Sequence, residues 1–170
     1  FYVPQDIQGL ITQVGGKERF VQKLDTLFEQ GYYWHGNEPN NQIAYLYPYA
    51  GQADKTQKWL RKIIREEYDT SPGGMSGNED GGQMSSWLVF SMMGFYPVCP
   101  GKPTYTLGSP MFEEVKIQTA SGKFFTIKTY NQSDSHPMID KMKLNGKPFS
   151  GIEITHQALL NGGLLEVWMK

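Results

Sequence analysis

Two adjacent carboxylates, Glu79 and Asp80, stand in a glycine-rich stretch of this 170-residue sequence, with glycines at positions 73, 74, 77, 81 and 82. Glycine adopts positive φ without strain and lets the backbone approach a ligand closely. Acids on such a loop, held by a rigid scaffold, are typical of catalytic loops. The alternative is that the pair only favours the start of the next helix through its dipole.

The segment that follows the two acids is strongly apolar. Residues Trp87–Phe95 include Leu88, Phe90 and Met92, and Gly94 and Pro97 stand near the end of the segment. This pattern predicts a buried helix that ends at Gly94. A buried helix at this position would hold the acids of the preceding loop in place.

A second candidate site lies in the polar loop over residues 35–42. Asn37, Glu38 and Asn40 offer amide and carboxylate oxygens, which are the ligands of a hard cation such as calcium. Their spacing is not that of an EF-hand. The alternative is a hydrogen-bonded loop with Glu38 near the start of the next helix, because these residue types also suit turns.

The first hundred residues predict helices that position these loops. Helical spacing covers 7–11, with Asp6 as its cap, then 17–30 up to Gly31, and 52–68. In the third of these helices Trp59 and Leu60 begin an apolar stripe, and the cations, Arg61 among them, are expected to form a solvated face. The residues 45–49 predict a further turn of helix.

After Pro100 the period of the pattern changes from 3.6 to 2. Strands are predicted over 103–107, 114–119, 124–130, 141–144 and 164–169, with a short helical turn over 154–160. Asn145-Gly146 is a hairpin signal. We therefore expect a mixed α and β chain: a helical part over residues 1–99 and an antiparallel β-rich part over residues 100–170.

Composition excludes several classes of function. The net charge of −1 gives no footprint for nucleic acid, and no apolar run is long enough to span a membrane. Cys99 is the single cysteine, and the three histidines lack the spacing of a zinc site, so each histidine is expected to be structural. The chain begins at Phe1 rather than Met, which predicts a processed or truncated N-terminus.

Several stretches, in this order, resemble one enzyme family. They are FYVPQDIQGLI, GGKERFVQKLD, GNEP followed by AYLYPYAG, KTQKWLRKI, PGGMSGNEDGGQMSSWLVFSMMGFYPVCPG and ITHQALLNGGLLEVWM. The sequence resembles the end of the catalytic region of glycoside hydrolase family 92, which comprises bacterial, calcium-dependent, exo-acting α-mannosidases, many of them specific for α-1,2 linkages. The match is dense over residues 1–99 and looser beyond.

The resemblance implies a fold and a setting. Residues 1–99 would supply the last helices of an (α/α)6 barrel, and residues 100–170 would pack with an N-terminal β-sandwich that is absent from this sequence. The substrate would be a mannose-containing glycan, cleaved with inversion of configuration. The resemblance also implies N-glycan degradation by a periplasmic, cell-surface or secreted protein, whose partner would be the missing N-terminal part.

The resemblance also implies roles for single residues. The general base would be Asp80, with Glu79 as its neighbour in the catalytic loop, and the general acid would be a Glu in an EGN-type motif upstream of Phe1. Gln5 stands where the family has a histidine, and Asn40, Asn41 and Gln42 stand where family members often have histidines after GNEP. The remaining assignments are calcium binding by Asn37, Glu38 and Asp80, and substrate binding by Asp6, Asn78 and Gln83.

Two other functions fit the same residues. One is a non-catalytic carbohydrate-binding or structural module that keeps the calcium loop. The other is a different (α/α)-barrel carbohydrate enzyme with similar loops. An acid of the EGN type upstream in the gene would favour the mannosidase.

Overall fold

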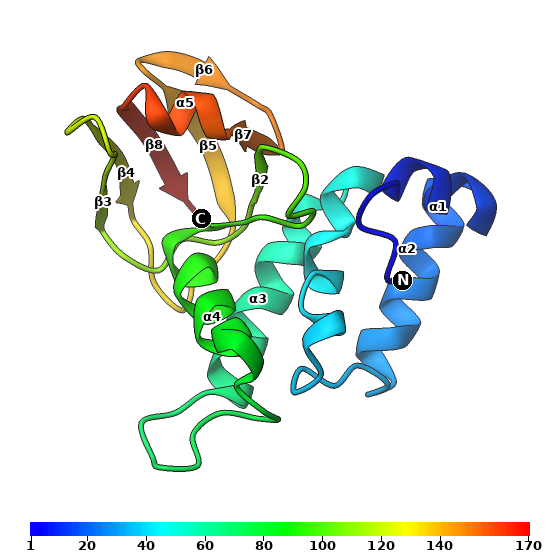
Figure 1. The fold of residues 1–170 in the computed structure, drawn as a ribbon. Helices are drawn as coiled ribbons and strands as arrows, with labels where there is room; N and C mark the ends of the chain where they lie inside the picture. The colour runs from blue at the N-terminus through cyan, green and yellow to red at the C-terminus, as the bar shows by residue number, and fades with distance from the viewer.

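The computed structural model describes all of residues 1–170, and it places a helical part beside a β-rich part (Figure 1). Residues up to 93 hold α1, α2, α3 and α4 with short 3-10 turns between them, and the residues from 95 onward hold all eight strands and the short helix α5. The predicted mixed α and β class is confirmed. The helices are α1 (Ile7–Val14), α2 (Lys17–Glu29), α3 (Ala53–Glu67), α4 (Gln83–Met93) and α5 (His156–Leu160).

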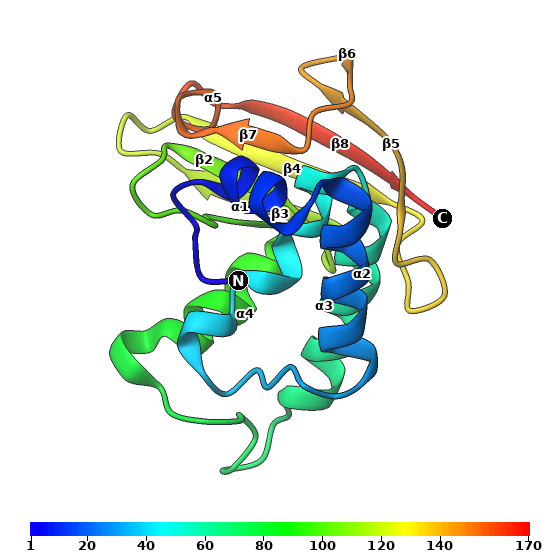
Figure 2. The same cartoon turned by 90° about the vertical axis from the view of Figure 1, so that its right-hand side faces the viewer.

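The strands form two sheets. A small sheet has the order β1-β2-β7, and a larger one has the order β3-β4-β8-β5-β6. Figure 2 shows the strands as a layer above the helices. The strands are β1 (Phe95–Tyr96), β2 (Thr104–Leu107), β3 (Glu114–Gln118), β4 (Phe124–Tyr130), β5 (Ile139–Leu144), β6 (Lys147–Phe149), β7 (Glu153–Thr155) and β8 (Gly163–Met169).

The prediction of a purely antiparallel β part is wrong, because the larger sheet is mixed. Strand β8 pairs parallel with β4 and antiparallel with β5. The chain between β4 and β8 is long enough to include β5, β6, β7 and α5, so β8 can return in the same direction as β4. The hairpin at Asn145-Gly146 is confirmed: both residues have positive φ, at 52° and 78°, and they join β5 to β6.

Two predicted elements differ at their limits. The segment 154–160 is split: β7 ends at Thr155, whose side chain then accepts a hydrogen bond from the Ala158 N–H and caps α5. Helix α4 begins at Gln83 rather than Trp87, and it is not buried throughout, since Val89 is 55% exposed. The apolar sequence of α4 therefore predicted more burial than the helix has.

Arg61 was expected on a solvated face of α3, but the structure buries it. Its side chain is buried, at 8% exposure, and it donates to Ser109 Oγ (2.8 Å) and to the Pro110 carbonyl (2.7 Å). Both acceptors lie on the loop that follows β2. A cation predicted to face water therefore joins α3 to the β-rich part.

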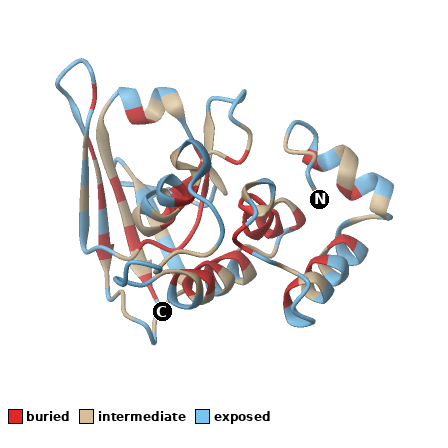
Figure 3. Ribbon diagram, turned by 60° about the horizontal axis from the view of Figure 1, so that its bottom comes forward, coloured by how far each residue is buried: buried red, intermediate tan, exposed pale blue.

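The buried residues form two cores, and Figure 3 shows buried segments both in the helices and in the strands. The larger core lies among the helices and includes Phe20, Leu24, Tyr45 and Trp87, and the smaller lies under the strands. Phe90 of α4 packs against both cores. No helix in the chain is long and apolar enough to cross a membrane.

Candidate functional site

The loop that carries Glu38 is anchored by a buried histidine. His35 is completely buried and lies between two tyrosine hydroxyls: Tyr33 at 2.8 Å from Nδ1 and Tyr68 at 2.7 Å from Nε2. Trp87 of α4 packs against the imidazole, with ring centroids 4.2 Å apart. The turn Glu38–Asn40 follows, with Pro39 in its first turn.

Burial lowers the pKa of His35 to about 4. The imidazole is therefore neutral near pH 7, because the low-polarity surroundings disfavour the charged form. Both of its nitrogens already have hydrogen-bond partners, so His35 positions the loop and is not a metal ligand. The prediction that His35 is structural agrees with this geometry.

The loop that carries Asp80 touches the Glu38 loop backbone to backbone. A Cβ atom at Gly77, where φ is +71°, would lie 2.0 Å from the Gly36 carbonyl oxygen, so only glycine fits there. Further on, Gly81 has a φ of +61° in the turn Asp80–Gly82 that leads into α4. These glycines hold the two loops in register and allow the chain to turn sharply at Asp80.

Glu79 and Asp80 have different surroundings although they are neighbours in sequence. The Glu79 carboxylate accepts hydrogen bonds from the Ser85 N–H (3.1 Å) and from the Ser85 hydroxyl (2.9 Å), at the first turn of α4. A carboxylate at a helix N-terminus is stabilised by the unpaired N–H groups there. The alternative given for the two acids, that they only favour the start of the next helix, therefore applies to Glu79.

Asp80 instead lines a cavity of about 380 Å³ together with Glu38. The volume lies in the range of small-molecule sites. The cavity opens between the N-terminal segment, the Glu38 turn, the start of α4 and the chain after β1. Its other lining residues are Tyr2, Pro4, Pro39, Gln42, Gln83, Tyr96, Pro97, Val98 and Pro100.

Of the predicted substrate-binding residues, one lines this cavity. Gln83 lies at its edge and donates a hydrogen bond to the Tyr96 hydroxyl (2.7 Å). Asp6 caps α1 by accepting from the Gly9 N–H (2.9 Å), and it lines a smaller neighbouring hollow of about 190 Å³. Asn78 lies with Glu79 on a third hollow beside α4.

The cavity wall contains buried polar atoms without partners. Glu38 Oε1 is buried and accepts no hydrogen bond, and Gln42 Nε2 is buried and donates none. Buried polar groups are normally satisfied, so an unpaired donor and an unpaired acceptor on one cavity indicate a place for a polar ligand. Gln42 and Tyr2 were not predicted as site residues. The signal for Gln42 in the sequence is a polar residue directly before the apolar segment that begins at Ile43.

The donor set fits calcium as part of its coordination shell. Glu38 and Asp80 supply carboxylate oxygens to one cavity, and calcium takes six to eight oxygens, with carbonyls and waters among them. No three His, Cys, Asp or Glu side chains come together anywhere in the chain as a metal-binding group. The side chain of Asn37 is exposed and does not line the cavity.

Comparison with known proteins gives concordant results over the whole chain. A family model described as the glycosyl hydrolase family 92 catalytic domain matches residues 1–170. A protein of Arthroderma benhamiae described as an uncharacterized secreted glycosidase is 36% identical over an alignment of 170 positions, which covers 98% of this chain and 22% of that protein.

Two solved structures from Bacteroides thetaiotaomicron are also similar. A family GH92 α-mannosidase superposes with a TM-score of 0.93 at 39% identity, over 99% of this chain and 23% of that one. A family GH92 inverting mannosidase superposes with a TM-score of 0.92 at 37% identity, over 99% and 26%. The chain thus spans about a quarter of the length of these relatives.

Proposed function

This chain belongs to glycosyl hydrolase family 92, and on that premise we propose that it forms part of an exo-acting α-mannosidase that removes terminal mannose from glycans with inversion. The observation that carries the proposal is that Asp80 and Glu38, from two separate loops, line one cavity of sugar-binding size. The relatives with solved structures are named as an α-mannosidase and an inverting mannosidase, which supports the substrate and the stereochemistry.

In this proposal Asp80 acts as the general base. Its carboxylate accepts a proton from a water molecule, whose oxygen attacks the anomeric carbon as the glycosidic bond breaks. A second carboxylic acid protonates the leaving oxygen from the opposite side, and the two carboxyls of an inverting enzyme stand roughly 6.5–9.5 Å apart to admit the water. We assign the acid to a residue outside residues 1–170, as the family resemblance implies.

Glu79 supports the base without contacting the water. Its hydrogen bonds to Ser85 fix the first turn of α4, and that turn fixes the backbone of the next residue, Asp80. A base must be held within hydrogen-bond reach of its water, so this anchoring contributes to positioning. We therefore reassign Glu79 from a catalytic to a positioning residue.

A calcium ion would be held by Glu38 and Asp80, with Asn37 on the same turn as Glu38. When bound, the ion would supply charge that binds the mannose hydroxyls and favours distortion of the ring. Gln83 would contact the sugar at the cavity edge, while Asp6 and Asn78, on adjoining hollows, would contact more distant parts of the glycan. The α-1,2 linkage is the one we propose.

We also propose a fold and a cellular location for the complete protein. The helices of residues 1–99 would complete an (α/α)6 barrel, and the sheets of residues 100–170 would pack with an N-terminal β-sandwich. The Arthroderma benhamiae relative is described as secreted, which supports a secreted, periplasmic or cell-surface location.

The test is Asp80→Asn in the longest natural polypeptide that contains this chain, with Glu79→Gln as the matched control. The amide keeps the shape of Asp80 and cannot accept the proton, so kcat should fall by about 10²–10⁴-fold while KM changes little. Hydrolysis of an α-1,2-mannobioside followed by proton NMR should release β-mannose first. Retained activity in Asp80→Asn together with a dead Glu79→Gln would exchange the two roles.

A further inference from the structure

Gln42 is the most deeply buried polar residue on the wall of the cavity. Its side chain is only 5% exposed, and it lines the same cavity as Asp80 and Glu38. Its backbone carbonyl accepts from the Tyr45 N–H (3.0 Å), so the main chain is engaged in the next turn. The side-chain amide Nε2, by contrast, has no hydrogen-bond partner.

The neighbouring Asn41 is held differently, although its side-chain Oδ1 is also buried without a partner. The carbonyl of Asn41 accepts from the Trp87 indole N–H (2.9 Å), and its side-chain amide lies 3.4 Å from the nitrogens of His35. Asn41 is thus tied to the core, and the adjacent Gln42 lies on the cavity. An unsatisfied buried amide lowers stability, and Gln42 lines the cavity, so a ligand there that accepts from Nε2 would supply the missing hydrogen bond.

Glu38 supplies the complementary group. Its buried Oε1 has no donor, and it stands four residues before Gln42 on the same wall. A hydroxyl group donates one hydrogen bond and accepts others, so one sugar hydroxyl satisfies an amide N–H and a carboxylate oxygen together. A carboxylate has two oxygens, so Glu38 retains acceptor capacity for a cation.

We infer that Gln42 and Glu38 together bind one hydroxyl of the sugar, with Gln42 Nε2 donating to the hydroxyl oxygen and Glu38 Oε1 accepting its hydrogen. The inference rests on the proposed function and adds a specificity-determining residue to it. A site whose buried polar groups pair with one hydroxyl discriminates strongly against a sugar that lacks that hydroxyl.

The test measures the activity of wild type and of Gln42→Met on an aryl α-mannoside and on its 2-, 3-, 4- and 6-deoxy forms. Both proteins are the longest natural polypeptide that contains this chain. Methionine keeps the length and removes the donor. Wild type should lose about 10- to 100-fold in kcat/KM on one deoxy substrate. Gln42→Met should lose a similar factor on the parent mannoside and lose little more on that one deoxy substrate.

Gln57→Met is the matched control. Gln57 is equally buried, at 6% exposure, but its Oε1 accepts from the Ile139 N–H (2.8 Å) and it does not line the cavity. Its replacement should lower the unfolding midpoint and leave the pattern across the deoxy substrates unchanged. If Gln42→Met does not fold, Gln42→Glu preserves the shape and should give the same loss of discrimination.

Two results would overturn the inference. Equal losses of Gln42→Met on every deoxy substrate would mean that the residue is structural. Loss of calcium binding in Gln42→Met would mean that the wild-type side chain faces a cation instead of a hydroxyl. Calorimetric binding of mannose and its deoxy forms separates the two proposals: a wild type that binds with the expected pattern but hydrolyses nothing refutes only the mannosidase, and one that binds none refutes both.

Discussion

At the level of single residues, adjacent carboxylates in this chain have separate tasks because their partners differ. Glu79 accepts two hydrogen bonds from Ser85, whereas Asp80 lines the cavity with Glu38. One peptide bond separates the two acids, and the turn with positive φ at Gly81 follows directly. A single loop therefore both fixes the start of α4 and presents a carboxylate.

Calcium binding can be tested with a variant of Glu38. If calcium is held by Glu38 and Asp80, removal of calcium with EGTA should abolish hydrolysis, and Glu38→Ala should have the same effect while the fold persists. Isothermal titration should detect calcium binding in wild type and not in Glu38→Ala.

Glu29→Ala serves as the control for the calcium experiment, because Glu29 lies at the end of α2 and away from the cavity. It should bind calcium like wild type. Full activity of wild type in excess EGTA, with Glu38→Ala equally indifferent to calcium, would remove the support for the metal.

The lowered pKa of His35 predicts that the stability of the folded chain depends on pH. Its folded pKa of about 4 lies below the ordinary value of 6.5, so the unfolded chain binds a proton between these values that the folded chain does not. The contribution of neutral His35 to the stability of the folded chain is present above pH 6.5 and is lost as the pH falls toward 4. Between pH 7 and pH 5 the loss should be about 2 kcal/mol.

Urea unfolding of wild type and His35→Gln at both pH values measures this contribution. The carboxylates titrate in both proteins, so the difference between the two slopes isolates the imidazole. Identical pH slopes for the two proteins would show that His35 does not carry the effect.

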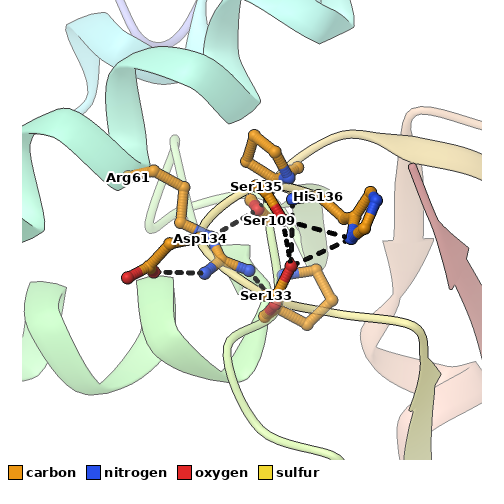
Figure 4. A network of polar contacts seen from close by, with 8 residues as sticks. Arg61, Ser109, Ser133, Asp134, Ser135 and His136 are labelled. Atoms are coloured by element: carbon orange, nitrogen blue, oxygen red, sulfur yellow. Dashed lines mark hydrogen bonds and ion pairs between the residues drawn. The ribbon is translucent and has the colours of Figure 1, made fainter.

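At the level of elements, Arg61 fastens α3 to the β-rich part (Figure 4). Besides its bonds to the Ser109 hydroxyl and the Pro110 carbonyl, its Nη1 lies 3.9 Å from Asp134, whose side chain is 96% exposed. Ser109 in turn donates to the Pro137 carbonyl (2.6 Å), which joins two loops of the β-rich part. Burial lowers the pKa of Arg61, and the guanidinium fork matches its two acceptors.

Arg61→Met should therefore lower the free energy of unfolding by about 2–5 kcal/mol, because it leaves buried acceptors unpaired. Arg61→Lys should recover only part of the loss, since an ammonium cannot reproduce the fork. Asp134→Asn should cost less than about 1 kcal/mol because an exposed ion pair is weak. Chemical denaturation of the three variants checks the order, and an Asp134→Asn loss as large as that of Arg61→Met would contradict it.

At the level of the whole molecule, α4 and β1 connect the two cores. Phe90 packs against both, and within β1 the side chain of Phe95 joins the smaller core while Tyr96 joins the larger. Tyr96 also lines the cavity. The β-rich part therefore contributes to the position of the cavity wall although it supplies few of its residues.

Residues 1–170 on their own should not hydrolyse an aryl α-mannoside, even with calcium present. An inverting glycosidase needs a general acid as well as a base, and this proposal places the acid outside these residues. The measurement is release of the aryl group by the purified, folded chain, compared with the longest natural polypeptide. If residues 1–170 hydrolyse the substrate and Asp80→Asn abolishes this activity, both the general acid and the general base lie within this chain.

The local patterns determined much of this protein. The spacing of Phe20, Leu24 and Phe28 predicted α2, and Asn145-Gly146 predicted the hairpin, because helical period and turn chemistry depend on neighbours along the chain. The motifs around Glu38 and Asp80 likewise indicated the family that the comparisons then showed. These features are local, so the sequence was sufficient for them.

What only the tertiary structure decided concerns partners that are distant in the sequence. The burial of Arg61 depends on a loop 48 residues away, and the parallel pairing of β8 depends on which edge of β4 is free. The presence of Asp80 and Glu38 on one cavity, and the unpaired amide of Gln42 there, depend on the packing of four segments. Periodicity along one segment carries no information about such contacts, because they form only when the segments pack together.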